Sequence, residues 1–206
     1  MNETIELLRQ GGWPMIPLGI CSLVGLAIIL ERFVSLRRHA VIDAEVEQMV
    51  DQFNGGSSAD DAISKCRRAR GPYARIIEEV LHARGHDRAY AIETMHSTGR
   101  AQLGYLERGL TMLEIIANIS PLIGLLGTVL GMVTVFNAIT TEGLGRPEVL
   151  SEGISKALIT TVAGLCVAIP ALAFHSWFSR RADDLAIEMQ NRATGFVAKL
   201  WESRVD

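Results

Sequence analysis

The stretch IIANISPLIGLLGTVLGMVTVFNAI, residues 115–139, contains no charged side chain and is the strongest indication of the fold. A bilayer core about 30 Å thick is crossed by roughly 20 apolar residues of helix, which this stretch exceeds. Two further stretches without Asp, Glu, Lys or Arg lie at 13–30 and 157–178. Any one of them also suits a buried helix of a soluble protein. Three without an amphipathic face predict an all-α protein with three membrane spans.

The overall composition excludes several other classes of protein. Apolar residues make up 49% of the 206 residues and charged residues 21%. The 20 basic and 23 acidic side chains nearly balance, and no basic stripe with interleaved aromatic residues indicates a nucleic-acid surface. Cys21, Cys66 and Cys166 form no CxxC pair, so neither a disulfide framework nor a zinc site is indicated.

Arginines near the span ends predict the orientation, because cytoplasmic flanks of membrane helices are enriched in Lys and Arg. Arg32, Arg37 and Arg38 follow the first stretch, and Arg180 and Arg181 follow the third. The segment before the first stretch and the loop between the last two carry one arginine each. The expected arrangement is an outer segment at 1–12, spans at 13–30, 110–139 and 155–178, a cytoplasmic helical domain at 31–109, an outer loop at 140–154 and a cytoplasmic helix at 179–206.

Between the first two spans, apolar residues recur every three or four positions, which predicts amphipathic helices. A helix that begins near Asp87 is expected to run through Met95 and Leu106 directly into the second span. The C-terminal tail, from Ala182 to Trp201, shows the same periodicity. We therefore expect long helices that continue out of the membrane into a cytoplasmic helical bundle.

Motifs of soluble enzymes are absent from the sequence, which predicts no catalytic residue, no cofactor and no metal site. His82 and His86 have the i,i+4 spacing of two metal ligands, but Gly85 is expected to end that helix. A solvated pair is the favoured interpretation. His175 lies at the cytoplasmic end of the third span, where an interface residue is a commoner role than a proton relay.

Small residues and one threonine share a face on each of the last two spans. On a helix of 3.6 residues per turn, the second-span set falls within about 60°. Small residues let helices approach closely in lipid, where packing drives association. The two sets are Pro121, Gly124, Thr128 and Gly131, with Gly127 forming a GxxxG pair with Gly131, and Ala157, Thr161, Gly164, Ala168 and His175.

Thr128 and Thr161 have two interpretations. Each hydroxyl can bond a carbonyl of its own helix and simply assist packing. Alternatively, both meet across a shared interior, because they lie near mid-depth on consecutive spans. Ionisable groups mark ion pathways in membranes, yet Glu114 and Lys156 lie only at the predicted edges of their spans. If the chain lines a proton path, the titrating carboxylate must come from another chain.

Two motifs resemble the MotA/TolQ/ExbB proton-channel family. They are ISPLIGLLGTVLG at residues 119–131 and ALITTVAGLCVAIP at residues 157–170. Together with LERGL at residues 106–110 they cover the C-terminal half, whereas the first span and the cytoplasmic segment match in layout and length only. Three spans resemble the ExbB and TolQ branch rather than MotA, which has four.

The resemblance implies a bacterial inner-membrane protein with periplasmic outer segments. Such proteins form a homopentamer around two copies of a single-span partner of the ExbD/TolR type, whose membrane aspartate carries the proton. Proton flow drives relative rotation, which is passed to a TonB- or TolA-type protein. It also implies pathway roles for Thr128 and Thr161, with packing around the partner by Pro121, Gly124, Gly127, Gly131, Gly164 and Ala168.

One position departs from the family pattern. ExbB and TolQ proteins commonly carry a glutamate five residues before the third-span threonine, where this chain has Lys156. Five residues correspond to about 140° around a helix, so Lys156 is expected to point away from Thr161. Two partners are open to the lysine, Glu152 or an acidic group on another chain.

The process that is energised stays open at this point. TonB-dependent uptake, Tol-dependent envelope maintenance and a specialised export or gliding system all use proteins of this kind. A membrane scaffold that keeps the family fold without conducting protons is the alternative from a different functional class.

Overall fold

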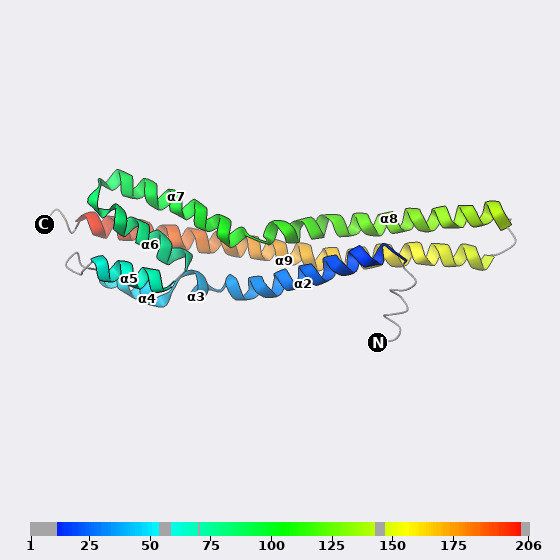
Figure 1. The fold of residues 1–206 in the computed structure, drawn as a ribbon, viewed down its shortest axis with the longest axis horizontal. Coiled ribbons are helices and arrows are strands. Elements are labelled where there is room, and N and C mark those ends of the chain that lie inside the picture. Colours follow the sequence, from blue (N-terminus) through cyan, green and yellow to red (C-terminus); the bar gives the residue numbers. More distant parts are fainter. Residues whose placement is uncertain (1–11, 54–58, 70, 143–146, 203–206) are drawn as a thin grey trace. The chain divides into compact units, whose positions relative to one another are not determined.

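Helices joined by short connections make up the part of the chain that the computed structural model describes, residues 12–53, 59–69, 71–142 and 147–202 (Figure 1). This confirms the predicted all-α class. The elements are α2 (Met15–Ser35), α3 (Arg38–Val41), α4 (Ala44–Gln52), α5 (Ala59–Ala69), α6 (Pro72–His82), the 3₁₀ turn η1 (Ala83–Gly85), α7 (Arg88–Glu107), α8 (Leu110–Glu142) and α9 (Pro147–Glu202).

The chain divides into two compact units. Unit 1 comprises Met1–Leu30 and Gly109–Trp177, and unit 2 comprises Glu31–Arg108 and Phe178–Asp206. Helices α2 and α9 contribute residues to both units, whereas α8 belongs to unit 1 and α4 to α7 belong to unit 2. The predicted outer segment, apart from Gly12, and the centre of the predicted outer loop lie outside the described residues.

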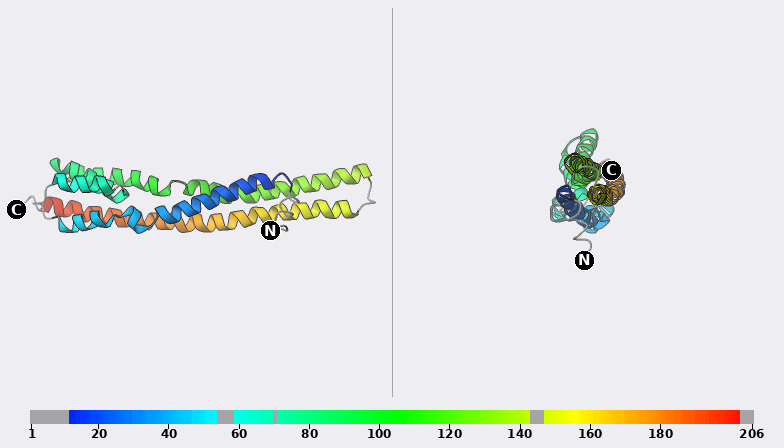
Figure 2. Two further views of the ribbon diagram at one scale, coloured as in Figure 1. Left: turned by 60° about the horizontal axis from the view of Figure 1, so that its bottom comes forward. Right: turned by 90° about the vertical axis from the view of Figure 1, so that its right-hand side faces the viewer.

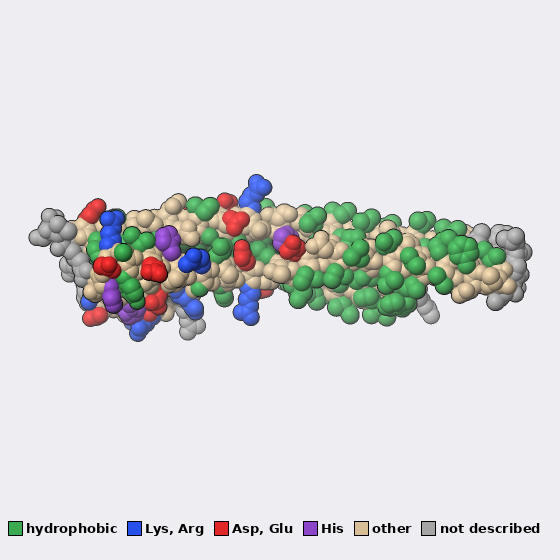
Figure 3. All heavy atoms as spheres, turned by 90° about the horizontal axis from the view of Figure 1, so that it is seen from above, with side chains coloured by type: hydrophobic (Ala, Val, Ile, Leu, Met, Phe, Trp, Pro, Cys, Tyr) green, Lys and Arg blue, Asp and Glu red, His purple; other side chains and the backbone are tan. Residues whose placement is uncertain are grey.

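Unit 1 contains the apolar helices that sequence analysis predicts as membrane spans. Met15–Ser35, Leu110–Asn137 and the apolar part of Ser151–Glu202 are long and apolar enough to cross a membrane. Their outward side chains are large and hydrophobic, as at Leu122, which is 62% exposed. Figure 3 shows such side chains over unit 1, with charged side chains gathered over unit 2. Exposed apolar area on this scale indicates a lipid environment, so the chain is a multi-pass membrane protein.

Helix α8 and the first part of α9 lie side by side and antiparallel in both views (Figures 1 and 2). Their contact is made by buried residues that recur in steps of three and four, the spacing of a coiled-coil seam. Most of these residues are small, which allows the two backbones to approach. The seam consists of Ser120, Gly124, Gly127, Gly131 and Val135 on α8, and Gly153, Ala157, Thr160 and Gly164 on α9, all buried except the half-buried Gly131.

The seam brings main chain against main chain at two glycines. A Cβ atom on Gly124 would lie 2.9 Å from the main-chain oxygen of Thr160. A Cβ atom on Gly164 would lie 2.6 Å from the main-chain oxygen of Ser120. A main-chain oxygen inside a helix is hydrogen-bonded and cannot move aside as the end of a side chain can. Glycine is therefore the residue that both positions require.

Helix α2 packs against another side of α8 within unit 1. A Cβ atom on Gly25 would lie 3.8 Å from side-chain atoms of Leu113 and Ile116, an ordinary van der Waals distance. Ile116 is buried, as is Leu113. The side of α8 that carries Ile116 is therefore occupied by α2, and this matters for the edge described below.

Unit 2 is a helical bundle with an aromatic core, as the amphipathic periodicity predicts. Tyr73 and Phe178 are fully buried, and Phe196 is almost so. Two edge-to-face ring pairs connect distant segments, with centroids 5.3 Å apart for Phe53 and Phe196 and 5.2 Å apart for Phe33 and Phe178. Such aromatic contacts fix the C-terminal part of α9 against segments far earlier in the chain.

The predicted continuous helix from Asp87 into the second span is wrong. Helix α7 ends at Glu107 and α8 begins at Leu110, because Gly109 has a φ angle of +85°. That left-handed conformation is accessible to glycine without a steric penalty and commonly ends helices. The buried guanidinium of Arg32 donates to the main-chain oxygen of Leu106, at 3.3 Å. It satisfies one of the carbonyls that the end of α7 leaves without a helical partner.

Four charged side chains of alternating sign form a network in unit 2. Arg38 contacts Glu188 at 2.7 Å and Glu47 at 3.0 Å. Arg192 completes the ring, at 2.7 Å from Glu47 and 3.1 Å from Glu188. The hydrogen bond from Arg38 is the main cause that lowers the pKa of Glu188, and Arg192 contributes in the same direction. The network links α4 and the segment around Arg38 to α9.

Replacing Gly164 by alanine is expected to lower the thermal unfolding midpoint of the detergent-solubilised protein. The new methyl group meets a main-chain oxygen, and overpacking of this kind typically costs about 1–3 kcal/mol. Gly19→Ala is the matched control, because Gly19 also lies in an apolar helix but nothing is within 4 Å of its Cβ position. Equal midpoints for the two variants would contradict the seam.

Replacing Glu188 by glutamine is expected to destabilise unit 2 at neutral pH and to matter less in acid. A carboxylate with a lowered folded-state pKa stabilises the protein above its unfolded pKa, and the stabilisation is lost as the pH falls through the folded value. Because the side chain is 33% exposed, the expected loss at pH 7 is only about 1 kcal/mol. Denaturant unfolding of the full chain between pH 7 and pH 3 measures it.

Asp184→Asn is the control for this substitution, because Asp184 is exposed on the same helix and outside the network. Its unfolding free energy should follow that of the unchanged protein across the pH range. A Glu188→Gln variant that loses the same stability at pH 3 as at pH 7 would show that the charge of Glu188 is not what stabilises the unit.

Candidate functional site

The two threonines that sequence analysis selects are half-buried beside the seam. The Thr161 hydroxyl donates across the helix pair to the main-chain oxygen of Gly124, at 3.4 Å. The Thr128 hydroxyl donates to the main-chain oxygen of Leu125 in its own helix, at 2.7 Å. Both hydroxyls thus have internal partners but are not enclosed by the seam. They lie at its border, where a further chain or water has access to them.

Both threonines lie on the same edge of the helix pair. Thr128 follows the seam residue Gly127 by one position, and Thr161 follows the seam residue Thr160 by one position. One position rotates a side chain by about 100° in the right-handed sense about its own helix. Because α8 and α9 run in opposite directions, the two rotations carry Thr128 and Thr161 to one side. We call this side the threonine edge.

The threonine edge is not the side on which α2 packs. Ile116, which contacts α2, lies eight residues before Gly124 and therefore about 80° from it, in the sense opposite to Thr128. Within unit 1, the described part of α2 therefore packs on the side of α8 that faces away from the threonine edge. The edge with Thr128 and Thr161 is left for whatever packs on it in an assembly.

The seam itself includes two hydroxyl residues that sequence analysis did not select. Thr160 is 1% exposed and donates to the main-chain oxygen of Ala157 at 2.8 Å, and Ser120 is fully buried and donates to that of Ile116 at 2.7 Å. These hydroxyls are satisfied inside their own helices, so they serve packing. Sequence analysis could have found these two residues, because they continue the three- and four-residue spacing of the small residues along each helix.

The residues predicted to pack around a partner lie at or beside the contact of α8 with α9. The Cβ position of Gly127 would meet the side chain of Thr160, and that of Gly131 would lie 3.0 Å from Ala157 Cβ. Ala168 is 6% exposed, whereas Pro121 is half-buried at the border. Gly124 and Gly164 meet as described above. Their packing around a partner chain stays a prediction.

An acid–base pair lies toward each end of the helix pair. Lys156 donates to Glu152 at 2.7 Å, so of the two partners open to this lysine the chain itself supplies one. At the other end, His175 Nε2 lies 3.9 Å from Glu114 Oε2. Between these pairs, residues 115–139 and 157–174 contain no Asp, Glu, Lys, Arg or His. The middle of the threonine edge is therefore polar but uncharged.

The two histidines with metal-like spacing do not form a site in the described residues. Helix α6 ends at His82, followed by η1 up to Gly85, as the predicted helix end requires. His82 Nε2 lies 3.8 Å from Glu78, whereas the ring of His86 stacks on Tyr90 with centroids 4.4 Å apart. The described part of the chain contains no group of three metal-binding side chains.

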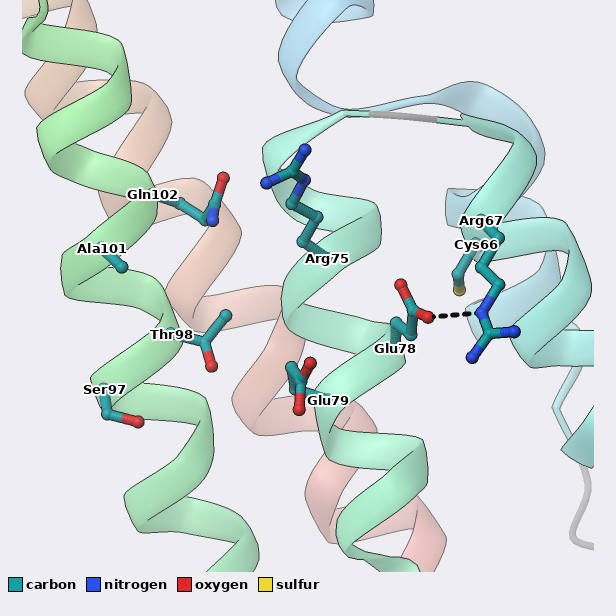
Figure 4. Close-up of a pocket in the computed structure, with 9 residues that line it drawn as sticks. All are labelled: Cys66, Arg67, Arg75, Glu78, Glu79, Ser97, Thr98, Ala101 and Gln102. Atoms are coloured by element: carbon teal, nitrogen blue, oxygen red, sulfur yellow. Dashed lines mark hydrogen bonds and ion pairs between the residues drawn. The ribbon is translucent and has the colours of Figure 1, made fainter.

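Unit 2 contains an open pocket of about 620 Å³ between α5, α6 and α7 (Figure 4). Arg67 pairs with Glu78 across it at 2.7 Å. Burial raises the pKa of the Cys66 thiol to about 12, so this sulfur is not a nucleophile. Mixed charge and an inert thiol do not indicate catalysis. The lining residues are Cys66, Arg67, Arg75, Glu78, Glu79, Ser97, Thr98, Ala101 and Gln102.

Comparison with known proteins agrees with the geometry of unit 1. A family profile described as the MotA/TolQ/ExbB proton channel family matches residues 68–191, which include α7, α8 and much of α9. The match therefore covers both helices of the seam and both threonines.

Individual relatives extend the likeness beyond this region. An ExbB homolog of Methanothermobacter thermautotrophicus, named as a biopolymer transport protein, is 28% identical over 89% of this chain and 65% of its own length. An ExbB-like protein of Synechocystis is 32% identical over 82% of this chain and 81% of its own. The Tol-Pal system protein TolQ of Pseudomonas aeruginosa is 38% identical over 46% of this chain and 41% of its own. The chain thus spans just under two thirds of the archaeal relative and most of the cyanobacterial one.

These matches cover more than half of the chain and include the close-packed pair of apolar helices with its threonine edge. The chain belongs to the MotA/TolQ/ExbB proton channel family, in its ExbB-like branch.

Proposed function

We propose that this protein is the proton-channel, or stator, subunit of an energy-transducing motor of the inner membrane. One observation carries the proposal: two neutral hydroxyls lie on one uncharged edge of a close-packed membrane helix pair. Membership in the ExbB/TolQ type supports an energy-transducing role in biopolymer transport, and the edge suggests how the chain contributes to it.

The edge suits a surface past which a protonated group moves. Thr128 and Thr161 offer hydrogen bonds to a carboxylic acid or to water without holding a fixed charge in the bilayer, where charge is costly. Because the middle of the edge has no titratable group, the proton is carried by a partner. The partner is a single-span protein of the ExbD/TolR type with a membrane aspartate, present as a dimer inside a homopentamer of this chain.

The seam has a mechanical part in this proposal. Its main-chain contacts hold the two threonines in a fixed relation while a partner helix turns beside them. The chain lies in the inner membrane among lipid, with the N-terminus in the periplasm and the C-terminus in the cytoplasm. Proton flow then drives a TonB-like protein that powers transport across the outer membrane.

A TolQ-type role in envelope integrity is the second candidate, supported by the likeness to TolQ of Pseudomonas aeruginosa across 46% of this chain. It uses the same edge and differs in the protein that is moved, TolA rather than TonB. A non-conducting scaffold is the alternative of a different class, and proton flux separates it from both.

Replacing Thr161 by valine is expected to lower proton flux strongly while the complex still assembles. Valine has nearly the same shape but no hydroxyl, and loss of a hydrogen bond inside a low-dielectric site typically lowers a rate by about tenfold or more. Flux is measured in vesicles that contain the chain copurified with its single-span partner, under an imposed pH gradient.

Thr134→Val is the matched control for this experiment. Thr134 is exposed on α8, and its hydroxyl likewise bonds its own helix, at 2.9 Å from the oxygen of Leu130. It lies ten residues after Gly124 and so about 80° from it, in the sense opposite to Thr128. This variant should conduct normally. Full conduction by the Thr161 variant would contradict a place for Thr161 in the proton path, whereas an unaltered complex that does not conduct would argue for the scaffold.

A further inference from the structure

The pair of His175 and Glu114 is one of two acid–base pairs on the described helix pair that the proposed function leaves unused, and the other is Lys156 with Glu152. His175 Nε2 lies 3.9 Å from Glu114 Oε2, an ion-pair distance when the imidazole is protonated. The His175 side chain is 21% exposed and that of Glu114 54%. The His175 side chain therefore lies largely inside the helix packing, whereas the Glu114 carboxylate reaches outward. Such an arrangement suits a pair that exchanges protons with its surroundings.

Helix register places this pair on the threonine edge. His175 follows Thr161 by fourteen residues, and Glu114 precedes Thr128 by fourteen residues. Fourteen residues are just under four turns, so each member lies within about 40° of its threonine and about 21 Å along the helix. The same displacement on both antiparallel helices puts Glu114 opposite His175, as the observed distance requires. The edge thus ends at a titratable pair.

No other charged group of unit 1 competes for His175 in the described residues. From α2, residues 12–30 contribute no charged side chain, and from α8 and α9 the stretches 115–139 and 157–174 contribute none. The next charged residues along the chain are Glu31 and Arg32 later in α2, Arg108 before α8 and Arg180 after the apolar part of α9. Within the unit, Glu114 is the acidic partner of the imidazole.

The two ends of the helix pair differ in how they hold a proton. At one end Lys156 pairs with Glu152, and an ammonium group keeps its proton at neutral pH. At the other end the base is an imidazole, which is the side chain that takes up and releases protons near neutral pH. The pair at Lys156 is therefore a fixed ion pair, whereas the pair at His175 can exchange.

We propose that His175 and Glu114 form the proton-release station of the threonine edge, a role that rests on the proposed function. A protonated carboxyl group of the partner helix gives its proton, through water, to the neutral imidazole. The O–H bond breaks with its electrons left on the carboxylate, and an N–H bond forms at His175. The Glu114 carboxylate stabilises the imidazolium, which then gives the proton to bulk water. The pair then returns to its starting state, and the cycle closes when the carrier's carboxylate takes up a new proton from the opposite side of the membrane.

The experiment measures proton flux against pH in vesicles that contain the native complex of this chain with its single-span partner. His175→Asn is expected to lower flux at neutral pH by about tenfold or more, because a positioned base is removed. The pH profile of the flux is expected to change as well. Glu114→Gln is expected to lower the flux and to change its pH profile, because the imidazolium loses its anionic neighbour. His96→Asn, an exposed histidine of α7, is the control.

A merely structural ion pair gives a different result. Wild-type flux with an unchanged pH profile in the His175 variant would overturn the proposal, as would wild-type flux with an unchanged pH profile in the Glu114→Gln variant. If Thr161→Val lowers the flux strongly while His175→Asn does not, only the release station fails. If neither variant changes it, or the unaltered complex does not conduct, the proposed function fails as well. The Glu114 variant keeps the test decisive if the His175 variant does not assemble.

Discussion

The contact of main chain with main chain at Gly124 and Gly164 is the constraint on which the candidate site depends. Lipid provides no hydrophobic gain for bringing two apolar helices together, so their association depends on close packing. Glycine allows the distance, and the steps of three and four residues keep it along the whole pair. A pair that is held in this way presents a defined border, and both threonines lie on that border.

The border that carries the two hydroxyls has no ionisable side chain in its middle. Between the pair at Lys156 and the pair at His175, the two apolar stretches carry no ionisable side chain. An uncharged polar edge solvates a moving carboxylic acid without trapping it, since a fixed countercharge would bind the ionised carrier strongly. In the proposed function, the chain offers one side of a proton path and the partner supplies the other.

Unit 2 is stabilised by means that suit water rather than lipid. Its core is aromatic, with Tyr73, Phe178 and Phe196 buried, and a network of four charges lies nearer its surface. The boundary between the units coincides with the break at Gly109, whereas α2 and α9 are continuous helices there. A glycine in the left-handed region lets α7 end and α8 begin anew, so each helix follows the packing of its own unit.

Much of this architecture is readable from the sequence, because the relevant signals are local. Length and hydropathy determine the three spans, and apolar periodicity determines the helices of unit 2. The small-residue motifs predict close packing, and the absence of charge at 115–139 means that, if the chain lines a proton path, the titrating group must come from another chain. The sequence alone also selects Thr128 and Thr161, although it does not show which residues lie between them.

Only the tertiary structure decided the details that join distant residues. It placed Thr160 and Ser120 inside the seam and Thr128 and Thr161 at its border, because the seam depends on the register of two antiparallel helices. It ended α7 before Gly109, where a main-chain angle overrides a helical pattern. It also brought His175 to Glu114, 61 positions apart in the chain. Register between helices is a property of their mutual packing, and no local pattern of residues specifies it.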